Sequence, residues 1–281
     1  MSLSKFALGD DLPQFEGSVR IHQRNVCTGE IRVTDFGNMV MTNFGEQAVY
    51  LIGGENLTTA IITRIALGTN ATAETVDDTA ITGANSVPIT TVTYSAAGES
   101  PAWVQFSATF GTTDGNGTNY EEVGLLFAGV NPNLAARKAF GGSMTKTQMW
   151  EWTVEWKLKI LPGGTLLDNF RTKLLHLIAG DVSGNYVTQM QFGTGTASVA
   201  VDDVHLQSPI TPAKTVLVDH PTVGMTRITA YLLDDEANGF TVAEAGLLTG
   251  DGTLVGRKVF AGILKESRYI LGYRWSIAPH V

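Results

Sequence analysis

The sequence contains one series of segments twice, in the same order in each half of the chain. Residues 43–54, NFGEQAVYLIGG, recur as residues 169–180, NFRTKLLHLIAG, and EVGLL at 122–126 recurs as EAGLL at 244–248. Three more pairs keep this order: LGTNATAETVDD with FGTGTASVAVDD, ARKAF with GRKVF, and Trp156 with Trp275. The period of about 120 residues is too long for a solenoid and has the size of a whole domain. We therefore expect two domains that share one fold.

The matched segments also set the expected domain boundaries. We place the first copy at residues 17–160 and the second at residues 161–281, with residues 1–16 outside the repeat as an N-terminal arm. Residues 156–169 align with residues 30–43, so the last strand of the first copy runs almost directly into the second copy. A junction without a flexible linker predicts two domains that are rigidly coupled side by side.

Alternating hydrophobicity predicts that both copies consist mainly of β-strands. Residues 150–160 place large apolar side chains at every second position with charged or polar ones between them, as in a strand with one buried face. Residues 269–277 repeat this period, and an Asn-Gly turn follows another alternating segment in each copy. With 31 glycines and 16% charged residues, the pattern favours an all-β protein of two tandem, duplicated β-sandwich domains of jelly-roll-like type.

One short helix is expected in each copy, at residues 43–52 and 169–178. The apolar residues of both segments have helical spacing, and Asn43 stands where an N-cap residue would accept a backbone hydrogen bond. Glu46 follows three positions later, as in a capping box, and Gly53-Gly54 ends the first segment.

Charge and composition exclude several classes of partner. The formal net charge is −8 and no dense run of Lys or Arg occurs, so we expect no nucleic acid partner and no binding to an anionic membrane. The chain has no apolar stretch of about 18 residues, and its first residues lack a basic segment followed by an apolar one. We therefore expect neither a membrane span nor a signal peptide. Cys27 is the single cysteine, which excludes an internal disulfide and a cysteine-based zinc site.

Two pairs of adjacent acids, Asp77-Asp78 and Asp202-Asp203, follow the Gly-Thr segment of each copy. They could act as general acids, as calcium ligands, or as residues that form and cap a turn. A calcium loop gathers more carboxylates, at alternating positions, than these two neighbours supply. The turn is therefore the favoured interpretation.

Glu122 and Glu244 occupy the same place in the two copies, shortly before a Gly-Leu-Leu segment. A pair of enzyme carboxylates is one interpretation. A catalytic pair would be expected in one copy only, within one cleft, whereas these acids are duplicated. Each is better explained as the fixed partner of a nearby arginine, Arg137 or Arg257.

The remaining candidate groups predict no catalytic, cofactor or metal site. The five histidines have no metal-like spacing, and none recurs in the other copy. The segment GTGTAS at 193–198 lacks the Lys-Ser/Thr ending of a phosphate loop, and no Gly-x-Ser-x-Gly elbow is present. The Trp and Tyr stripe could be a sugar platform, but its alternation with charged residues favours the core, which leaves Trp103 as the strongest exposed candidate. We expect no enzyme.

Three segments of the first copy resemble a family of tailed-bacteriophage virion structural proteins. They are ITRIALGTNATAETVDDTAI at 62–81, NYEEVGLLF at 119–127 and LAARKAF at 134–140, the last followed by a Lys-bearing loop and a Trp-rich strand. That family has an IALGTG segment, a pair of acids, an EAGLF strand and a final TWTI-like strand. The resemblance extends over residues 28–160 and, less closely, over residues 157–281. The chain is also similar to the N-terminal attachment domain of phage tail-collar fibres.

The resemblance implies a virion protein that is assembled in the host cytoplasm. Its expected partners are other proteins of the capsid or tail, and further copies of itself in a homo-oligomer. Two domains leave no room for a long shaft and a separate tip, so we expect a capsid decoration protein or a collar, baseplate or fibre-adaptor part. The alternative is a carbohydrate-binding module for host-surface glycans, or a degraded glycosidase, which would need aromatic side chains on a solvent-exposed face.

Overall fold

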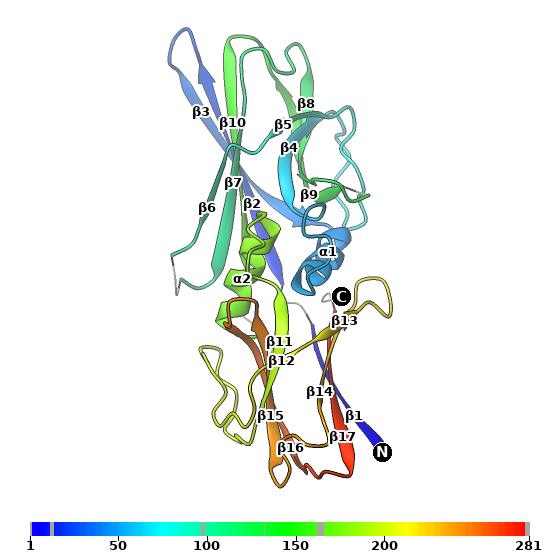
Figure 1. Cartoon of the computed structure of the whole chain (residues 1–281). Helices are drawn as coiled ribbons and strands as arrows, with labels where there is room; N and C mark the ends of the chain where they lie inside the picture. Colours follow the sequence, from blue (N-terminus) through cyan, green and yellow to red (C-terminus); the bar gives the residue numbers. More distant parts are fainter. Residues whose placement is uncertain (1, 12–13, 97–98, 132, 162–165, 279–281) are drawn as a thin grey trace.

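The computed structural model describes residues 2–11, 14–96, 99–131, 133–161 and 166–278 (Figure 1). Within these residues strands predominate and the helices are short, which confirms the expected all-β class. We call residues 14–161 the first half. Residues 166–278, together with the strand formed by Ser2–Asp11, are the second half.

The elements of the first half are helix α1 (Thr42–Ile52) and the strands β2 (Phe15–Asn25), β3 (Ile31–Val40), β4 (Ile62–Gly68), β5 (Asn85–Pro88), β6 (Thr91–Tyr94), β7 (Ala102–Phe110), β8 (Asn119–Phe127), β9 (Leu134–Thr145) and β10 (Trp150–Ile160). The elements of the second half are helix α2 (Asp168–Ile178) and the strands β1 (Ser2–Asp11), β11 (Val187–Gly193), β12 (Lys214–Thr215), β13 (Leu217–Asp219), β14 (Thr226–Leu232), β15 (Thr241–Thr249), β16 (Leu254–Leu264) and β17 (Tyr269–Ala278).

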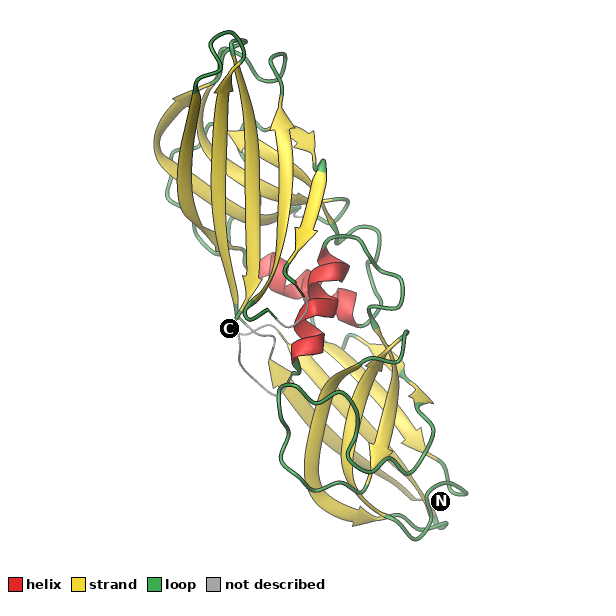
Figure 2. Ribbon diagram, turned by 90° about the vertical axis from the view of Figure 1, so that its left-hand side faces the viewer, coloured by secondary structure: helices red, strands yellow, loops and turns green. Residues whose placement is uncertain are grey.

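Strand β3 joins the two layers of the first half into one nine-stranded sheet, in the order β5-β4-β8-β9-β3-β2-β10-β7-β6. It pairs with β2 along most of its length, and only its last residues, Met39 and Val40, pair with β9. The second half has two four-stranded sheets instead, ordered β1-β17-β14-β13 and β12-β11-β15-β16. In both halves the layers face each other in a β-sandwich-like arrangement around apolar side chains (Figure 2).

Equivalent strands of the two halves pair in the same register. Gly124 lies opposite Arg137 between β8 and β9, and Gly246 lies opposite Arg257 between β15 and β16. The four strands that the sequence predicts for each copy are present, as β7 to β10 and as β14 to β17. The repeated sequence therefore corresponds to repeated strand pairing.

The alternating aromatic stripe on β10 and β17 belongs to the core, as predicted. Trp152, Trp156 and Trp275 are each 0% exposed. Both strands are paired on two sides, β10 with β2 and β7, and β17 with β1 and β14. These three tryptophans are thus not available to stack on a sugar.

Helix α1 begins one residue earlier than expected, and its N-terminal capping differs from the prediction. The backbone N–H of Thr42 donates to the carbonyl of Val76, which starts the helix at Thr42 and leaves Met41 at the N-cap position without a side-chain cap. Asn43 therefore lies inside the first turn, where its side-chain amide donates to the carbonyl of Leu134. The predicted capping box is wrong for this reason.

The glycine that ends each helix is confirmed by its backbone conformation. Gly54 and Gly180 have φ angles of 83° and 92°, which an L side chain adopts only with strain. Both glycines also lie against the other half: a Cβ at Gly54 would be 2.7 Å from the ring of Tyr186, and one at Gly180 would be 3.3 Å from Ile61. The helix ends are therefore fixed by packing between the halves.

The predicted N-terminal arm, residues 1–16, contains strand structure. Strand β1 runs parallel to β17, and β2 already begins at Phe15. The segment is thus an edge strand of a second-half sheet instead of a free arm. Because β17 has only β14 on its other side, loss of β1 would leave one edge of β17 unpaired.

The molecule is elongated, and the two halves lie end to end with α1 and α2 between them (Figures 1 and 2). This arrangement differs from the side-by-side coupling that we expected. One apolar cluster extends from Val19 of β2 through both helices to Ile277 of β17. We call the region where the helices and the facing loops meet the seam. The two halves therefore share a continuous core across the seam, which is consistent with rigid coupling.

Candidate functional site

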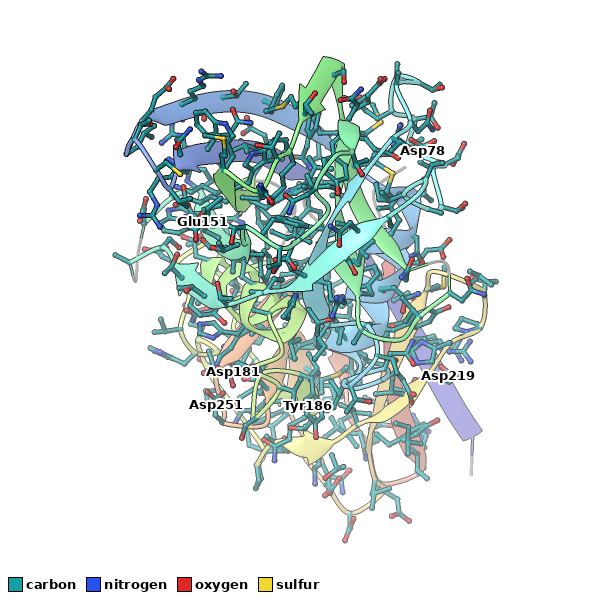
Figure 3. The ribbon with its side chains drawn as sticks, turned by 90° about the horizontal axis from the view of Figure 1, so that it is seen from above. Asp78, Glu151, Asp181, Tyr186, Asp219 and Asp251 are labelled. Atoms are coloured by element: carbon teal, nitrogen blue, oxygen red, sulfur yellow. The ribbon has the colours of Figure 1, made fainter. Side chains whose placement is uncertain are left out.

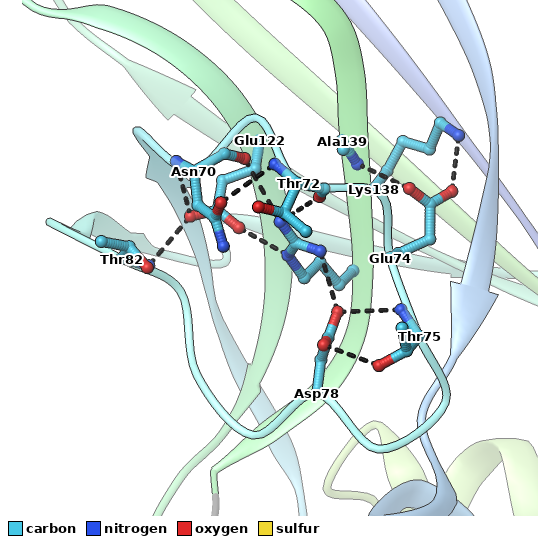
Figure 4. A network of polar contacts seen from close by, with 10 residues as sticks. Asn70, Thr72, Glu74, Thr75, Asp78, Thr82, Glu122, Lys138 and Ala139 are labelled. Atoms are coloured by element: carbon cyan, nitrogen blue, oxygen red, sulfur yellow. Dashed lines mark hydrogen bonds and ion pairs between the residues drawn. The ribbon is translucent and has the colours of Figure 1, made fainter.

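The predicted partner of Glu122 is Arg137, and the two side chains form a buried ion pair on β8 and β9 (Figure 4). Nε of Arg137 donates to Oε2 of Glu122 at 2.6 Å, and Nη1 donates to Oδ2 of Asp78 at 2.8 Å. Glu122 is 0% exposed and Arg137 is 1% exposed. The second acid of the Asp77-Asp78 pair therefore binds the same arginine.

The second half contains the same cluster. Nε of Arg257 donates to Oε2 of Glu244 at 2.9 Å, and its Nη1 donates to Oδ2 of Asp203 at 2.9 Å. Glu244 is buried on β15 and Arg257 on β16, in the positions that match those of the first half. Both ion pairs predicted from the repeat are confirmed.

The two glutamates also hold the loops that precede them in the chain. Oε1 of Glu122 accepts hydrogen bonds from the backbone N–H groups of Asn70 and Thr82. In the second half, the carboxylate of Glu244 accepts from backbone N–H groups of residues 195, 207 and 208. Each carboxylate thus satisfies donors of a loop that has no regular strand pairing of its own. The segment GTGTAS belongs to this loop and binds the protein's own glutamate.

The charge state of these clusters follows from their contacts. Burial opposes ionisation of Asp78, but hydrogen bonds from Thr75 and from the Arg137 guanidinium outweigh it, so the pKa of Asp78 lies below its usual value. For Glu244, burial is likewise outweighed by backbone N–H groups and by Arg257, and its pKa is lowered. Despite its burial, the pKa of Arg137 is raised by its two carboxylate partners. With lowered pKa values, Asp78 and Glu244 are therefore not held ready to donate a proton near neutral pH.

Two buried lysines form a second duplicated feature, which was not predicted from the sequence. Nζ of Lys146 donates to the carbonyl of Gly111 at 2.6 Å and lies 3.3 Å from Oδ1 of Asn116. Nζ of Lys265 lies 3.0 Å from Oδ1 of Asn238. Both lysines are 0% exposed. The signal was present in the sequence, because each lysine follows a matched strand and each asparagine belongs to a matched Asn-Gly turn.

The lysines hold the Asn-Gly loops closed at the two far ends of the molecule. Burial lowers the pKa of Lys146, while its oxygen ligands are those that an ammonium group prefers. In the described part of the chain, the hydrogen-bond partners of both Nζ atoms are backbone carbonyl oxygens and asparagine side-chain oxygens. None of these groups is a nucleophile or a proton donor. We interpret both as structural cations.

The other predicted site residues do not form a metal centre. Among the described residues no group of three or more His, Cys, Asp or Glu side chains is arranged to bind a metal ion. Asp78, from the first pair of adjacent acids, lies apart from two other acids, Glu151 and Asp219, which the sequence did not single out (Figure 3). Cys27 is exposed and unpaired. The calcium interpretation of the doubled acids thus has no support in their placement.

Two histidines lie at the seam between the halves. The ring of His220 packs against Tyr50 of α1 with a centroid distance of 4.7 Å, and the ring of His176 on α2 stacks on Tyr94 of β6 at 4.2 Å. Next to His220, the hydroxyl of Thr226 donates to the carbonyl of Val49 at 2.7 Å. These side chains hold each helix against the opposite half.

Trp103, the exposed aromatic candidate, is half-buried and engaged on two sides. Its indole N–H donates to Oε1 of Glu99 at 2.9 Å, and Nζ of Lys157 lies 4.0 Å from the ring centroid. The indole N–H is therefore already satisfied, and Lys157 covers one face of the ring.

A pocket of about 230 Å³ opens at the seam, between the segment before β7 and the first turn of α2. It contains Asp202, the acid of the second pair that does not bind Arg257. Its lining is formed by Glu99, Ser100, Ala102, Asp168, Asn169, Arg171, Thr172, Val201, Asp202 and Val204. The sequence did not predict this site, because its residues come from three segments that only the fold brings together.

No protein-family model matches the chain, and no curated protein or solved structure shows a significant similarity to it. Neither described helix is long and apolar enough to span a membrane.

Proposed function

We propose that this protein is a non-enzymatic structural component on the exterior of a tailed-bacteriophage virion. It would consist of two fused copies of one β-sandwich unit and act as a capsid decoration protein or as a collar, baseplate or fibre-adaptor part. Its partners would be capsid or tail proteins and other copies of itself. The resemblance of residues 28–160 to virion proteins is the starting point of this proposal.

The duplicated ion clusters are the observation that supports a structural role most strongly. In both halves the conserved pattern of the repeat places its acids on one buried arginine and on loop N–H groups. A catalytic acid or base needs a proton-transfer partner within reach and a pKa near the working pH. The pKa values of Asp78, Asp203 and Glu244 are instead lowered. The acids of both clusters bind a buried arginine and secure loops to sheets. A rigid frame of this kind suits a protein whose task is to hold a position in an assembly.

The outer edge of β3 supports contact with another protein. From Ile31 to Asn38, β3 pairs with β2 alone among the described strands, so its other edge is open. Ile31 and Val33 on this strand are 63% and 51% exposed. An open edge with apolar side chains is a surface that soluble proteins usually cover. On a symmetric particle many copies of such a weak contact would add together.

Antibody-gold labelling of intact, purified virions tests this proposal. We expect label on the exterior of the particle, over the head for a decoration protein or at a few points on the tail for an adaptor. A protein that is expressed during infection but leaves the particles unlabelled, and whose peptides are missing from their mass spectra, would contradict the proposal.

A further inference from the structure

Two long strands have an open edge, one in each half of the molecule. From Ile31 to Asn38, β3 pairs with β2 alone among the described strands, and β1 pairs with β17 alone. Four of the other strands at the ends of sheets, β5, β6, β12 and β13, have only two to four residues. The fifth, β16, meets Leu166 at Gly256. Proteins often keep edge strands short, which avoids unwanted pairing, and the long edges of β3 and β1 lack this protection.

The open edge of β3 presents backbone groups and exposed apolar side chains. The N–H of Asn25 donates to the carbonyl of Glu30 at 2.8 Å, next to the turn between β2 and β3. Since every second residue of an antiparallel strand bonds to its partner, residues 31, 33, 35 and 37 point their N–H and C=O groups away from β2, where no described strand lies. Ile31 and Val33 are exposed at this edge. The segment has no Lys, no Pro and no bulge, so the usual devices that block an edge are missing.

The first half shows which strand covers an edge like that of β1. There β2 pairs with β10, and β3 covers the other edge of β2. In the second half β1 pairs with β17 at the equivalent place, but no described strand covers its other edge. The repeat explains the difference: residues 31–40, which form β3, align with residues 157–166, and residues 157–160 are already the end of β10. The second half therefore lacks a counterpart of β3, and the edge of β1 is open where that strand would lie.

We propose that β3 of one copy of the chain pairs along β1 of the next copy, so that the protein assembles head to tail. The two strands lie in opposite halves of the elongated molecule, so one copy cannot pair them with each other (Figure 1). Pairing between copies covers both open edges with one contact, whereas two β3 strands on a twofold axis would leave β1 open. A contact between two different surfaces repeats from copy to copy and closes into a ring where the rotation permits. The inference names the partner of the β3 edge and in this respect rests on the proposed function, but its test requires only purified protein.

Light scattering of the full chain over a range of concentrations tests the proposal. We expect the unaltered protein to reach a mass above that of a dimer as its concentration rises. The double variant Ile31→Lys/Val33→Lys should stay monomeric, because charged side chains block the β3 edge. The matched control is Thr91→Lys/Thr93→Lys, which adds the same charge at exposed positions of β6, the opposite edge of the same sheet, and should assemble like the unaltered protein. Thermal unfolding confirms that both variants are folded.

Mixing the β3 variant with unaltered protein separates head-to-tail pairing from a symmetric dimer. The variant keeps β1, so it should still bind the β3 edge of an unaltered copy, end the oligomer and lower the average mass. A tagged variant that retains no unaltered protein would mean that β3 pairs with β3, and a variant that dimerises alone would mean that β1 pairs with β1. Either result overturns the proposal, as does an unaltered protein that stays monomeric or a β6 control that fails to assemble.

Hydrogen exchange of the unaltered protein at low and high concentration provides a test that needs no variant. Protection of residues 2–11 and of residues 31–38 should increase together as copies assemble. An increase in one segment alone, or in neither, overturns the pairing. Virions that carry the label while the purified protein stays monomeric would contradict this inference but leave the proposed function intact. Head-to-tail oligomers of a protein that is missing from virions would contradict the proposed function and leave the pairing intact.

Discussion

Each of the two halves has the same buried ion cluster, but the halves differ in the strands that pair with β10 and β17. Around Arg137 and Arg257 the partners, the register and the loop contacts correspond. In the first half, β10 is covered by β2, which runs antiparallel to it and continues into β3. In the second half, β17 is covered by β1 in parallel orientation, from a distant part of the chain. The ion cluster is thus the same in both halves, whereas the strand that pairs with β10 differs in origin and direction from the strand that pairs with β17.

The helices show the same contrast between shared and individual features. Both end at a glycine that packs on the other half, and both contribute to the continuous core. Only α2 carries a buried arginine in its first turn, beside the seam pocket. The features found in both halves therefore belong to the common fold, whereas the buried arginine of α2 is specific to the second half.

The largest effect is expected from the buried arginines. Arg137→Met and Arg257→Met should each lower the free energy of unfolding by about 3 to 5 kcal/mol, because Glu122 or Glu244 then stays buried without its cation. Urea unfolding measures this loss. Arg20→Met is the control, since its ion pair with Asp35 is exposed and its removal should leave the midpoint almost unchanged. A large loss for one arginine and none for the other would refute the equivalence of the two clusters.

The tryptophans of the central strands give a second comparison. Trp156→Ala on β10 and Trp275→Ala on β17 should each destabilise the protein by about 3 to 5 kcal/mol, because both rings are fully buried. Thermal midpoints that stay unchanged in both variants would mean that the rings are exposed in solution. That result would restore the sugar-platform interpretation of the stripe.

A smaller effect is expected at the two ends of the molecule. Lys146→Met and Lys265→Met keep the length of the side chain but remove the donors to the Asn-Gly loops. Each should destabilise the protein by about 1 to 3 kcal/mol, the usual cost of leaving buried acceptors unpaired. Hydrogen exchange should increase in residues 111–117 for the first variant and in residues 233–239 for the second. Increased exchange at the opposite end only would contradict a local role.

The smallest effect is the response to acid. The pKa values of Asp78, Asp203 and Glu244 are lower in the folded protein than in the unfolded chain, so their contribution to stability is present above the unfolded values and is lost as the pH falls through the folded ones. The thermal midpoint should therefore be nearly constant down to about pH 5 and fall below about pH 4. The Arg137→Met and Arg257→Met variants should show a shallower fall. A midpoint that rises towards acid pH would contradict the assigned ion pairs.

The sequence was sufficient for the features that depend on local pattern and on repetition. Alternation predicted β10 and β17 as strands with a buried face, and the duplicated acids indicated the partners Arg137 and Arg257. Both signals lie within short segments, so no knowledge of tertiary structure was needed.

Features that depend on tertiary contacts were predicted incorrectly or missed. Asn43 has a side chain that is typical of an N-cap. The backbone N–H of Thr42 donates to the carbonyl of Val76, however, and the helix begins at Thr42. The pairing of β1 with β17 joins opposite ends of the chain, which no local pattern reveals. Arg171 reads as an ordinary helical arginine in the sequence, although it is only 3% exposed in the fold.

The central claim is that the two halves form one rigid body with a shared core across the seam. Hydrogen exchange followed by mass spectrometry at increasing urea concentration tests it most directly, because it reports the two halves separately. We predict that peptides from β10 and β17 lose protection at the same urea concentration, and that α1 and α2 lose it with them. Loss of protection in β17 and α2 while β10 stays protected would contradict the claim, and would mean that the halves unfold as independent domains.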